Sequence, residues 1–170
     1  MKIRHTLVKD LPRIMEIYDY ARKFMTKTGN PNQWGVNNWP PEELIREDIA
    51  QDRSYVCIND NNEVIGTFCY FYGKDIDPTY LVISNGQWIG NNEYGVIHRL
   101  AGDGSQKGIG AFCINWAFEQ CGHIRIDTHT DNKVMQKLAT KLGFIQCGII
   151  HVQQDNDPRI AYEKITENRK

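Results

Sequence analysis

The chain has 170 residues, a length typical of one compact domain with its own core. Twenty Lys and Arg residues stand against 21 Asp and Glu residues, so no basic field favours nucleic acid or a membrane surface as a partner. The chain lacks the run of about 18 apolar residues that spans a membrane, and its first residues lack the apolar segment of a signal peptide. We expect a cytoplasmic protein with neither nucleic acid nor a membrane as partner.

The five cysteines include no C-x-x-C pair, which is the spacing typical of zinc and redox sites. Most of them lie among apolar residues in strand-like or helix-like segments. This pattern favours buried free thiols in a reducing compartment. We expect no bound metal.

The first part of the chain predicts a strand followed by two helices. Residues 2–7 look like a strand, and Asp10 then stands where a helix cap is found. Apolar residues recur at helical spacing from Ile14 until Thr28-Gly29-Asn30-Pro31, which ends the helix. A loop over residues 30–41 follows, and the two prolines at its end begin a short second helix.

Strand-like segments dominate the middle of the chain. Residues 54–58 and 63–72 flank a turn of Asn and Asp residues and so predict a β-hairpin. A longer irregular segment over residues 73–92 leads to a strand over residues 94–101. The polar loop 102–107 comes next and precedes a helix.

The remaining chain alternates helices with strands. A helical pattern begins at Gly108, and a strand over residues 123–128 follows it. Asp131 or Asn132 caps the next helix, which Gly143 ends.

Two strands, residues 145–152 and 159–165, close the chain around the turn Asp155-Asn156-Asp157-Pro158. The predicted order is β-α-α-β-β-β-α-β-α-β-β. The strand–helix–strand unit from Tyr94 to Thr128 requires a parallel strand pair with a right-handed crossover. We therefore expect one mixed α/β (α+β) domain over residues 1–170, with a mostly antiparallel sheet.

Gly108-Ile109-Gly110 opens the helix after the polar loop. Glycines let a ligand approach the main chain, and the first turn of a helix has unpaired N–H groups and the positive end of the dipole. The segment is either an anion site for a phosphate or pyrophosphate, or a structural turn. The Rossmann pattern fails because Cys113 replaces its third glycine, and the P-loop pattern fails because Ile109 follows Gly108.

Two sequence blocks lie in register with these elements. Gly108-Ile109-Gly110-Ala111 follows a strand that ends in Arg99-Leu100-Ala101-Gly102, and Asn132-Lys133-Val134-Met135 precedes Leu138-Ala139-Thr140-Lys141-Leu142-Gly143-Phe144. With these blocks the chain resembles the GNAT superfamily of acetyl-coenzyme A-dependent N-acetyltransferases. The resemblance covers essentially the whole chain. It implies a GNAT-like sheet with a splayed parallel strand pair and helices on both faces.

The resemblance also implies the reaction, which is transfer of an acetyl or acyl group from acetyl-coenzyme A (acetyl-CoA) to a primary amine. The amine would attack directly in a ternary complex. The cofactor arm would lie between the splayed strands, with the pyrophosphate at the start of the helix. The family's cofactor-binding positions fall on Leu100, Ala101, Gly102, Ser105, Gln106, Lys107, Gly108, Ile109, Gly110, Ala111 and Asn132.

Two positions depart from the family pattern. Ser105 stands where the family has Arg or Gln, so phosphate binding would rely on backbone amides and on Lys107. Ala139 stands where many members have a Tyr that is thought to protonate the departing thiolate. Water or another residue would do so in this chain. Ala139 also keeps open an alternative, a noncatalytic protein that binds or senses acyl-CoA.

The acceptor amine must lose a proton, so the reaction requires a base or a water relay. His98 lies in the strand nearest the acyl group, and histidine is a common general base. Asp127 lies in the parallel partner strand. Each has an alternative interpretation. His98 could be a hydrogen-bonded core histidine, and Asp127 a carboxylate paired with Arg125 or Arg99.

His129 and Glu93 are further candidate bases at loop ends, where we expect them to be solvated. The two irregular segments hold four aromatic candidates for substrate binding: Trp34, Trp39, Tyr80 and Trp88. Such side chains either wall an acceptor pocket or cover the edge of the core. The resemblance implies an acceptor amine on a small molecule or a peptide, and a small amine, an amino acid, an aminoglycoside and a protein N-terminus all stay open. We expect a monomer or a homodimer.

Overall fold

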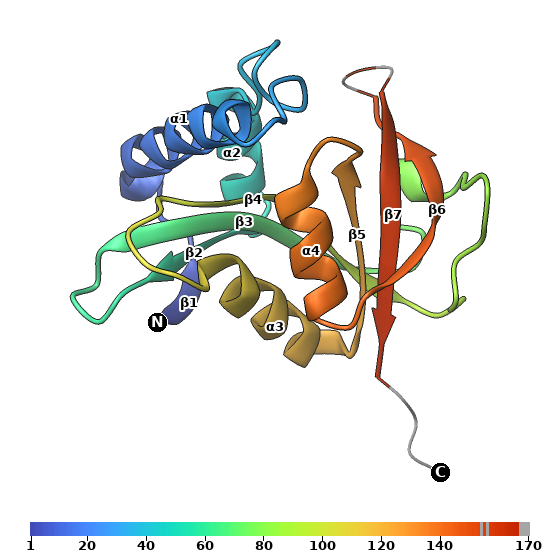
Figure 1. Ribbon diagram of the computed structural model, residues 1–170. Helices are drawn as coiled ribbons and strands as arrows, with labels where there is room; N and C mark the ends of the chain where they lie inside the picture. Colours follow the sequence, from blue (N-terminus) through green and yellow to red (C-terminus); the bar gives the residue numbers. More distant parts are fainter. Residues whose placement is uncertain (154, 156, 167–170) are drawn as a thin grey trace.

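A seven-stranded sheet in the order β1-β2-β3-β4-β5-β7-β6 runs through the molecule (Figure 1). The computed structural model describes residues 1–153, 155 and 157–166. Neighbouring strands are antiparallel except β4 and β5, which are parallel. The strands are β1 (Lys2–His5), β2 (Ser54–Ile58), β3 (Val64–Gly73), β4 (Tyr94–Gly102), β5 (His123–His129), β6 (Ile145–His151) and β7 (Pro158–Ile165).

Helices cover both faces of this sheet. Helices α1 (Leu11–Lys27) and α2 (Glu42–Ala50) pack on one face, where Ile14, Ile17 and Ile45 are buried. Helices α3 (Ile109–Cys121) and α4 (Lys133–Lys141) pack on the other face, over a second buried cluster. The succession of α-helices and strands confirms the predicted order and the mixed, mostly antiparallel sheet.

The parallel strands β4 and β5 are joined at one end only. Gly95 pairs with Ile124 and Val96 with Arg125, and within the described chain these are the only paired positions between the two strands. Figure 1 shows the consequence: β3 and β4 run across the view, whereas β5 and β7 stand upright. The strands therefore diverge towards their carboxyl ends, and this confirms the predicted splayed pair.

A β-bulge in β4 lies where the strands diverge. Thr67 of β3 pairs with Ala101 and Cys69 with His98, so a single residue of β3 lies opposite both Arg99 and Leu100. A bulge of this kind bends the strand that carries the extra residue. The backbone of Arg99 has a φ of 55°, in a region that costs a residue other than glycine on the order of 1–3 kcal/mol.

Contacts from α1 and α2 hold this bulge. The hydroxyl of Tyr18 donates to the carbonyl oxygen of Arg99 over 3.0 Å, and Nη2 of Arg99 lies 2.5 Å from Oδ2 of Asp48. The helices on this face therefore stabilise a strained backbone in the strand beneath them.

Two local predictions need correction, and a third is confirmed. Asp10 stands before α1 as expected, but its carboxylate accepts from the Leu7 amide (2.8 Å) and from Arg4 (2.7 Å), not from helix amides. Because Leu7 turns towards Asp10, β1 ends at His5 and does not reach Leu7. Of the two residues proposed to cap α4, Asn132 does so, since its Oδ1 accepts from the amide of Met135 over 3.0 Å.

The predicted turn before β7 falls partly outside the described residues, because Asn156 is not among them. The cysteines are free thiols, as predicted, and all but Cys121 are buried. In the part of the chain that the structure describes, no helix has both the length and the apolar character required to cross a bilayer.

Glu163 of β7 anchors the irregular segment that precedes β4. Its carboxylate, which is fully buried, accepts hydrogen bonds from the amide of Ile89, from Nε2 of His123 (2.6 Å) and from Nε of Arg125 (2.9 Å). Burial disfavours the charged carboxylate, but these hydrogen bonds outweigh it and hold the pKa of Glu163 below its usual value. Glu163 therefore stabilises the fold in its ionised form.

We predict that Glu163→Gln lowers the free energy of unfolding by about 3–5 kcal/mol at pH 7, because it leaves the buried Arg125 without its carboxylate. Because the pKa of Glu163 is lower in the folded than in the unfolded state, its ionised form stabilises the fold above the unfolded pKa of 4.5. The difference in free energy of unfolding between parent and variant therefore shrinks as the pH falls below that pKa. Urea unfolding at pH 7 and at lower pH measures both effects. Glu47→Gln, at an exposed position of α2, is the matched control and should change little. A Glu163→Gln protein as stable as its parent would contradict this account.

Candidate active site

A cavity of about 220 Å³ lies where β4 and β5 diverge. His98, Arg99 and Leu100 of β4 form one wall, and Asp127 and Thr128 of β5 form another. The loop over residues 30–41 and the beginning of β7 complete it. If β4 and β5 were paired along their full length, their main chains would fill this space.

His98 lies between two carboxylates in this cavity. Its Nε2 is 2.5 Å from Oδ2 of Asp77, and its Nδ1 is 3.8 Å from Oδ1 of Asp127. An ionised carboxylate can only accept, so Nε2 carries the proton towards Asp77. In the neutral ring the lone pair then lies on Nδ1, on the side of Asp127. The structure therefore makes His98 a hydrogen-bonded histidine that also lines a cavity.

Asp77 is held in turn by the short 3₁₀ helix η2 (Pro78–Tyr80). Its Oδ1 accepts from the amide and the hydroxyl of Thr79, over 2.9 and 2.7 Å. Burial disfavours the charged form of Asp77, but the hydrogen bonds from His98 and Thr79 outweigh it and lower the pKa of this carboxyl. Asp77 is therefore an ionised, fixed partner for the imidazole.

Asp127 has neither of the arginine partners that the sequence offers. Arg125 pairs with Glu163 and Arg99 with Asp48. The carboxylate of Asp127 accepts instead from the hydroxyl of Tyr80 over 2.7 Å, and its side chain is 10% exposed. Asp127 thus faces the cavity as a buried carboxylate without an arginine.

Two of the four aromatic candidates line the cavity, and the other two lie behind its wall. Trp34 and Trp39 line the cavity itself. Tyr80 is buried behind Asp127, and the indole of Trp88 packs on it with ring centroids 5.3 Å apart. Nε1 of Trp88 also donates to the carbonyl oxygen of Tyr80 over 2.8 Å. Tyr80 and Trp88 therefore support the cavity wall from behind.

A second hollow, a groove of about 280 Å³, lies between α1, α4 and the beginning of α3. Gly108 directly precedes α3 with a φ of 88°, and the space where its Cβ would lie is open. Residues with such a φ are usually glycine. Most of the predicted cofactor positions line the groove, namely Leu100, Ala101, Gly102, Gln106, Gly108, Ile109, Gly110 and Asn132.

The other three predicted cofactor positions lie elsewhere. Ser105 lines a separate depression, and its amide donates to Asp103 over 2.9 Å. Lys107 and Ala111 are sequence neighbours of groove residues but do not line the groove in the described structure. The walls of the groove next to α3 therefore consist largely of main chain and small side chains.

The cavity and the groove meet. Met25, Leu100, Asn132 and Met135 line both of them. Asn132 also holds the loop 30–41 in place, because its Nδ2 donates to Oε1 of Gln33 over 3.0 Å. A ligand in the groove and a ligand in the cavity would thus contact the same four side chains.

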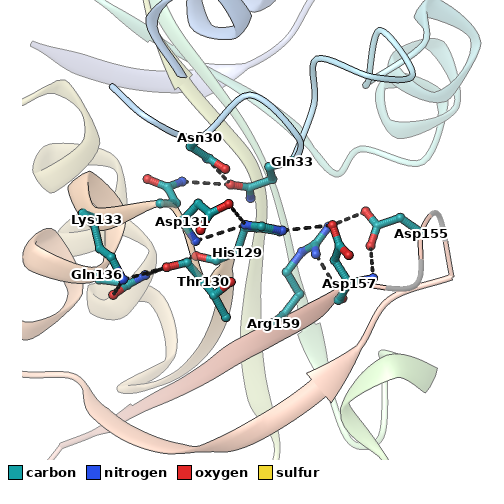
Figure 2. Close-up of polar contacts among 11 residues, drawn as sticks. Asn30, Gln33, His129, Thr130, Asp131, Lys133, Gln136, Asp155, Asp157 and Arg159 are labelled. Atoms are coloured by element: carbon teal, nitrogen blue, oxygen red, sulfur yellow. Dashed lines mark hydrogen bonds and ion pairs between the residues drawn. The ribbon is translucent and has the colours of Figure 1, made fainter. Parts of the chain in front are cut away.

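His129 is not solvated, contrary to the prediction. It is 4% exposed, its Nε2 lies 3.1 Å from Oδ2 of Asp157, and its Nδ1 accepts from the amide of Asp131 (Figure 2). Asp157, directly before β7, thus contacts a ring that is buried. Glu93 is exposed as expected and accepts from the hydroxyl of Tyr72.

Ala139, which stands at the position of the frequent family Tyr, is a fully buried residue of α4 that packs in the core. Asp77, Gln33 and Arg159 line the cavity although no sequence motif pointed to them. Their positions depend on chain segments that are distant in the sequence.

A family model described as acetyltransferase (GNAT) family matches residues 14–144. The chain belongs to this family. A search among curated proteins found no match.

Solved structures agree with the family. A GNAT-family acetyltransferase from Streptococcus agalactiae 2603 is 28% identical, with a TM-score of 0.87 over 98% of this chain and 96% of the other. A protein of Staphylococcus aureus MU50, assigned provisionally as an acetyltransferase, is 26% identical, with a TM-score of 0.67 over 97% and 99%. The ribosomal-protein-S18-alanine N-acetyltransferase of Escherichia coli is 12% identical, with a TM-score of 0.61 over 99% and 98%, and it shares the fold alone.

We predict that neutral His98 of this GNAT protein carries its proton on Nε2, because the Asp77 carboxylate only accepts. Two-dimensional ¹⁵N–¹H NMR of the imidazole rings distinguishes the two tautomers. Asp77→Ala should give a mixture of tautomers for His98, whereas the exposed ring of His5 stays unchanged as an internal control. A predominantly Nδ1-protonated His98 in the parent protein would contradict the assignment.

Proposed function

We propose that the protein is an N-acetyltransferase that transfers the acetyl group of acetyl-CoA to a primary amine, by direct attack in a ternary complex. We further propose that residues 1–170 form one catalytic domain. The observation that carries this proposal is the meeting of two hollows at Leu100. One contains the paired His98 and Asp77, and the other lies at the glycine-rich beginning of α3.

The groove is the proposed site of acetyl-CoA, the co-substrate that the family uses. The first amides of α3 have no partner within the helix and can donate to the pyrophosphate, and the helix dipole favours the same negative charge. The open space at Gly108 lets an anion approach the main chain. The acyl end would then lie near Leu100, where groove and cavity meet.

The cavity is the proposed site of the acceptor amine. The amine enters as an ammonium ion beside Asp127 and gives one proton to Nδ1 of His98. Asp77 fixes the ring orientation and stabilises the imidazolium that forms, as an orienting carboxylate does for other histidine bases. Asp77 acts here as a positioning residue, because it reaches the reacting atoms only through His98.

The neutral amine then attacks the thioester carbonyl carbon. A carbon–nitrogen bond forms, the attacking nitrogen loses its second proton to water, the carbon–sulfur bond breaks, and the departing thiolate takes up a proton. Buried Ala139 has no proton to give, so we assign this proton to water or to the imidazolium of His98. The reaction converts ammonium and thioester into amide and thiol and releases one proton overall.

A noncatalytic acyl-CoA sensor remains the second candidate, because Ala139 replaces the frequent Tyr. The two candidates differ in what they require of the cavity. A sensor needs only the groove, whereas the contact between His98 and Asp77 serves a proton transfer. The cavity therefore favours the enzyme.

The first test is activity. With acetyl-CoA and a panel of primary amines, the purified protein should release free thiol. His98→Gln should lower kcat by about 10²–10⁴-fold, the usual contribution of a general base, without weakening the binding of acetyl-CoA. His151→Gln, at an exposed position, is the matched control. Binding of acetyl-CoA without thiol release from any amine would favour the sensor, and full activity of His98→Gln would exclude this base.

The second test concerns the groove. A Cβ at Gly110 would lie 3.2 Å from Cδ2 of Leu138 and 3.8 Å from Cδ2 of Leu100. Gly110→Val therefore adds methyl groups between two lining side chains, and we expect acetyl-CoA binding to weaken at least about tenfold, or ~1.4 kcal/mol.

Calorimetric titration with acetyl-CoA measures this effect, after thermal unfolding has shown that each variant is folded. Ser105→Ala is the control, because Ser105 lines the separate depression, and its affinity should stay close to that of the parent. A folded Gly110→Val protein with parental affinity would remove acetyl-CoA from this groove.

A further inference from the structure

The two arginines that line the cavity are already paired with carboxylates. Nη2 of Arg99 lies 2.5 Å from Asp48, and Nη2 of Arg159 lies 2.5 Å from Asp155. Nη1 of Arg159 also donates to the carbonyl oxygen of Asp157 over 3.1 Å. These guanidinium groups are 13% and 1% exposed. A carboxylate on a ligand would have to compete with partners that the fold already holds in place.

Two cavity carboxylates have no such cation. The side chains of Asp77 and Asp127 are 9% and 10% exposed. Within the described residues His98 is the only basic side chain near them, because no lysine or arginine nitrogen comes within 4.0 Å of either carboxylate. His98 must be neutral to accept a proton. The cavity and its ion pairs then contain four carboxylates and two guanidinium groups, namely those of Asp48, Asp77, Asp127 and Asp155 and those of Arg99 and Arg159.

Hydrogen bonds from His98 and Thr79 compensate Asp77, but the cavity still has a net negative charge, and a buried negative charge favours a cation beside it. Oδ1 of Asp127 accepts from the hydroxyl of Tyr80, and in the part of the chain that the structure describes this is the one hydrogen bond to the Asp127 carboxylate. Since Asp127 lines the cavity, this carboxylate is available to a ligand.

Two further features favour a small cation. Trp34 and Trp39 line the same cavity, and the faces of aromatic rings attract ammonium groups. The volume of about 220 Å³ is below the range of roughly 300–1,000 Å³ that holds drug-sized ligands. Whatever enters the cavity is therefore short as well as positively charged.

We propose that the acceptor is a short aliphatic diamine, that is, an amine with a second positive charge and no carboxylate. This proposal rests on the function proposed above and adds the substrate class. The reacting ammonium pairs with Asp127 beside His98. The second ammonium compensates the remaining negative charge. An amino acid would instead bring a carboxylate towards Asp77 and Asp127.

The experiment compares four matched amines: pentylamine, 1,5-diaminopentane, 5-aminopentanoate and L-lysine. Thiol release from acetyl-CoA by the full-length protein gives kcat/KM for each. We expect 1,5-diaminopentane to exceed each of the others at least about tenfold, since each adds a carboxylate or lacks the second charge. L-lysine is the sharpest comparison, because it is the same diamine with one carboxylate added.

A binding measurement separates recognition from chemistry. Calorimetric titration of the protein loaded with coenzyme A should show that Asp127→Asn weakens 1,5-diaminopentane at least about tenfold. Asp60→Asn makes the same charge change at a side chain that is 96% exposed, and it should leave the affinity unchanged. Equal losses in both variants would mean that net charge, not Asp127, attracts the ligand, and would overturn the proposal.

The outcomes distinguish this proposal from the proposed function. A preference for L-lysine or 5-aminopentanoate would show that Arg159 or Arg99 binds a carboxylate. Equal kcat/KM values for pentylamine and the diamine would show that the second charge is not recognised. Either result overturns the diamine and leaves the acetyltransferase. Binding of acetyl-CoA without thiol release from any amine would overturn both.

Discussion

The bend of β4 at Arg99 is the constraint on which the rest of the site depends. Adjacent strands of a sheet lie about 4.8 Å apart and leave no room for a ligand between them. Beyond the positions where β4 pairs with β5, the bulge bends β4, and the strands diverge around a cavity. The left-handed backbone of Arg99 persists because Asp48 holds its side chain and Tyr18 holds its carbonyl group. Helices α1 and α2 therefore help to form the site from the opposite face of the sheet.

Side-chain hydrogen bonds hold the irregular segments against the sheet. Glu163 holds the chain at Ile89, and Asp77 holds both η2 and the ring of His98. Gln33 joins the loop 30–41 to Asn132, a residue that lines both the cavity and the groove. Buried side-chain hydrogen bonds, which are costly to leave unmade, place these loops against the sheet. The cavity walls are thereby fixed before any ligand arrives.

The two hollows are chemically different, and each suits a different part of the proposed reaction. The groove offers main-chain amides at the start of α3 and open space at Gly108, which suits a large anion. The cavity offers carboxylates and aromatic rings, which suit a cation. This separation of charge directs the two proposed substrates to opposite sides of Leu100. In the proposed function, the main-chain amides of α3 would replace the Arg or Gln that the family has at the position of Ser105.

The sequence by itself determined the order of elements and the places where helices begin and end. Periodicity, the glycines at 108 and 143 and the cap at Asn132 are local features, and they act between residues about three to four positions apart. They are sufficient to predict the strand–helix–strand unit and its parallel pair. The family blocks added the groove residues, because those residues are contiguous with the same local features.

Only the tertiary structure decided which side chains meet in the cavity. Asp77 lies 21 residues from His98, Tyr80 lies 47 from Asp127, and Gln33 lies 99 from Asn132. No local pattern encodes such pairs, since they form only when the sheet closes and the loops fold onto it. For the same reason the sequence could not show that His129 is buried, or that Arg99 and Arg125 pair with Asp48 and Glu163 and leave Asp127 without an arginine. The charge of the cavity is thus a property of the folded chain, because it depends on which charged side chains neutralise one another.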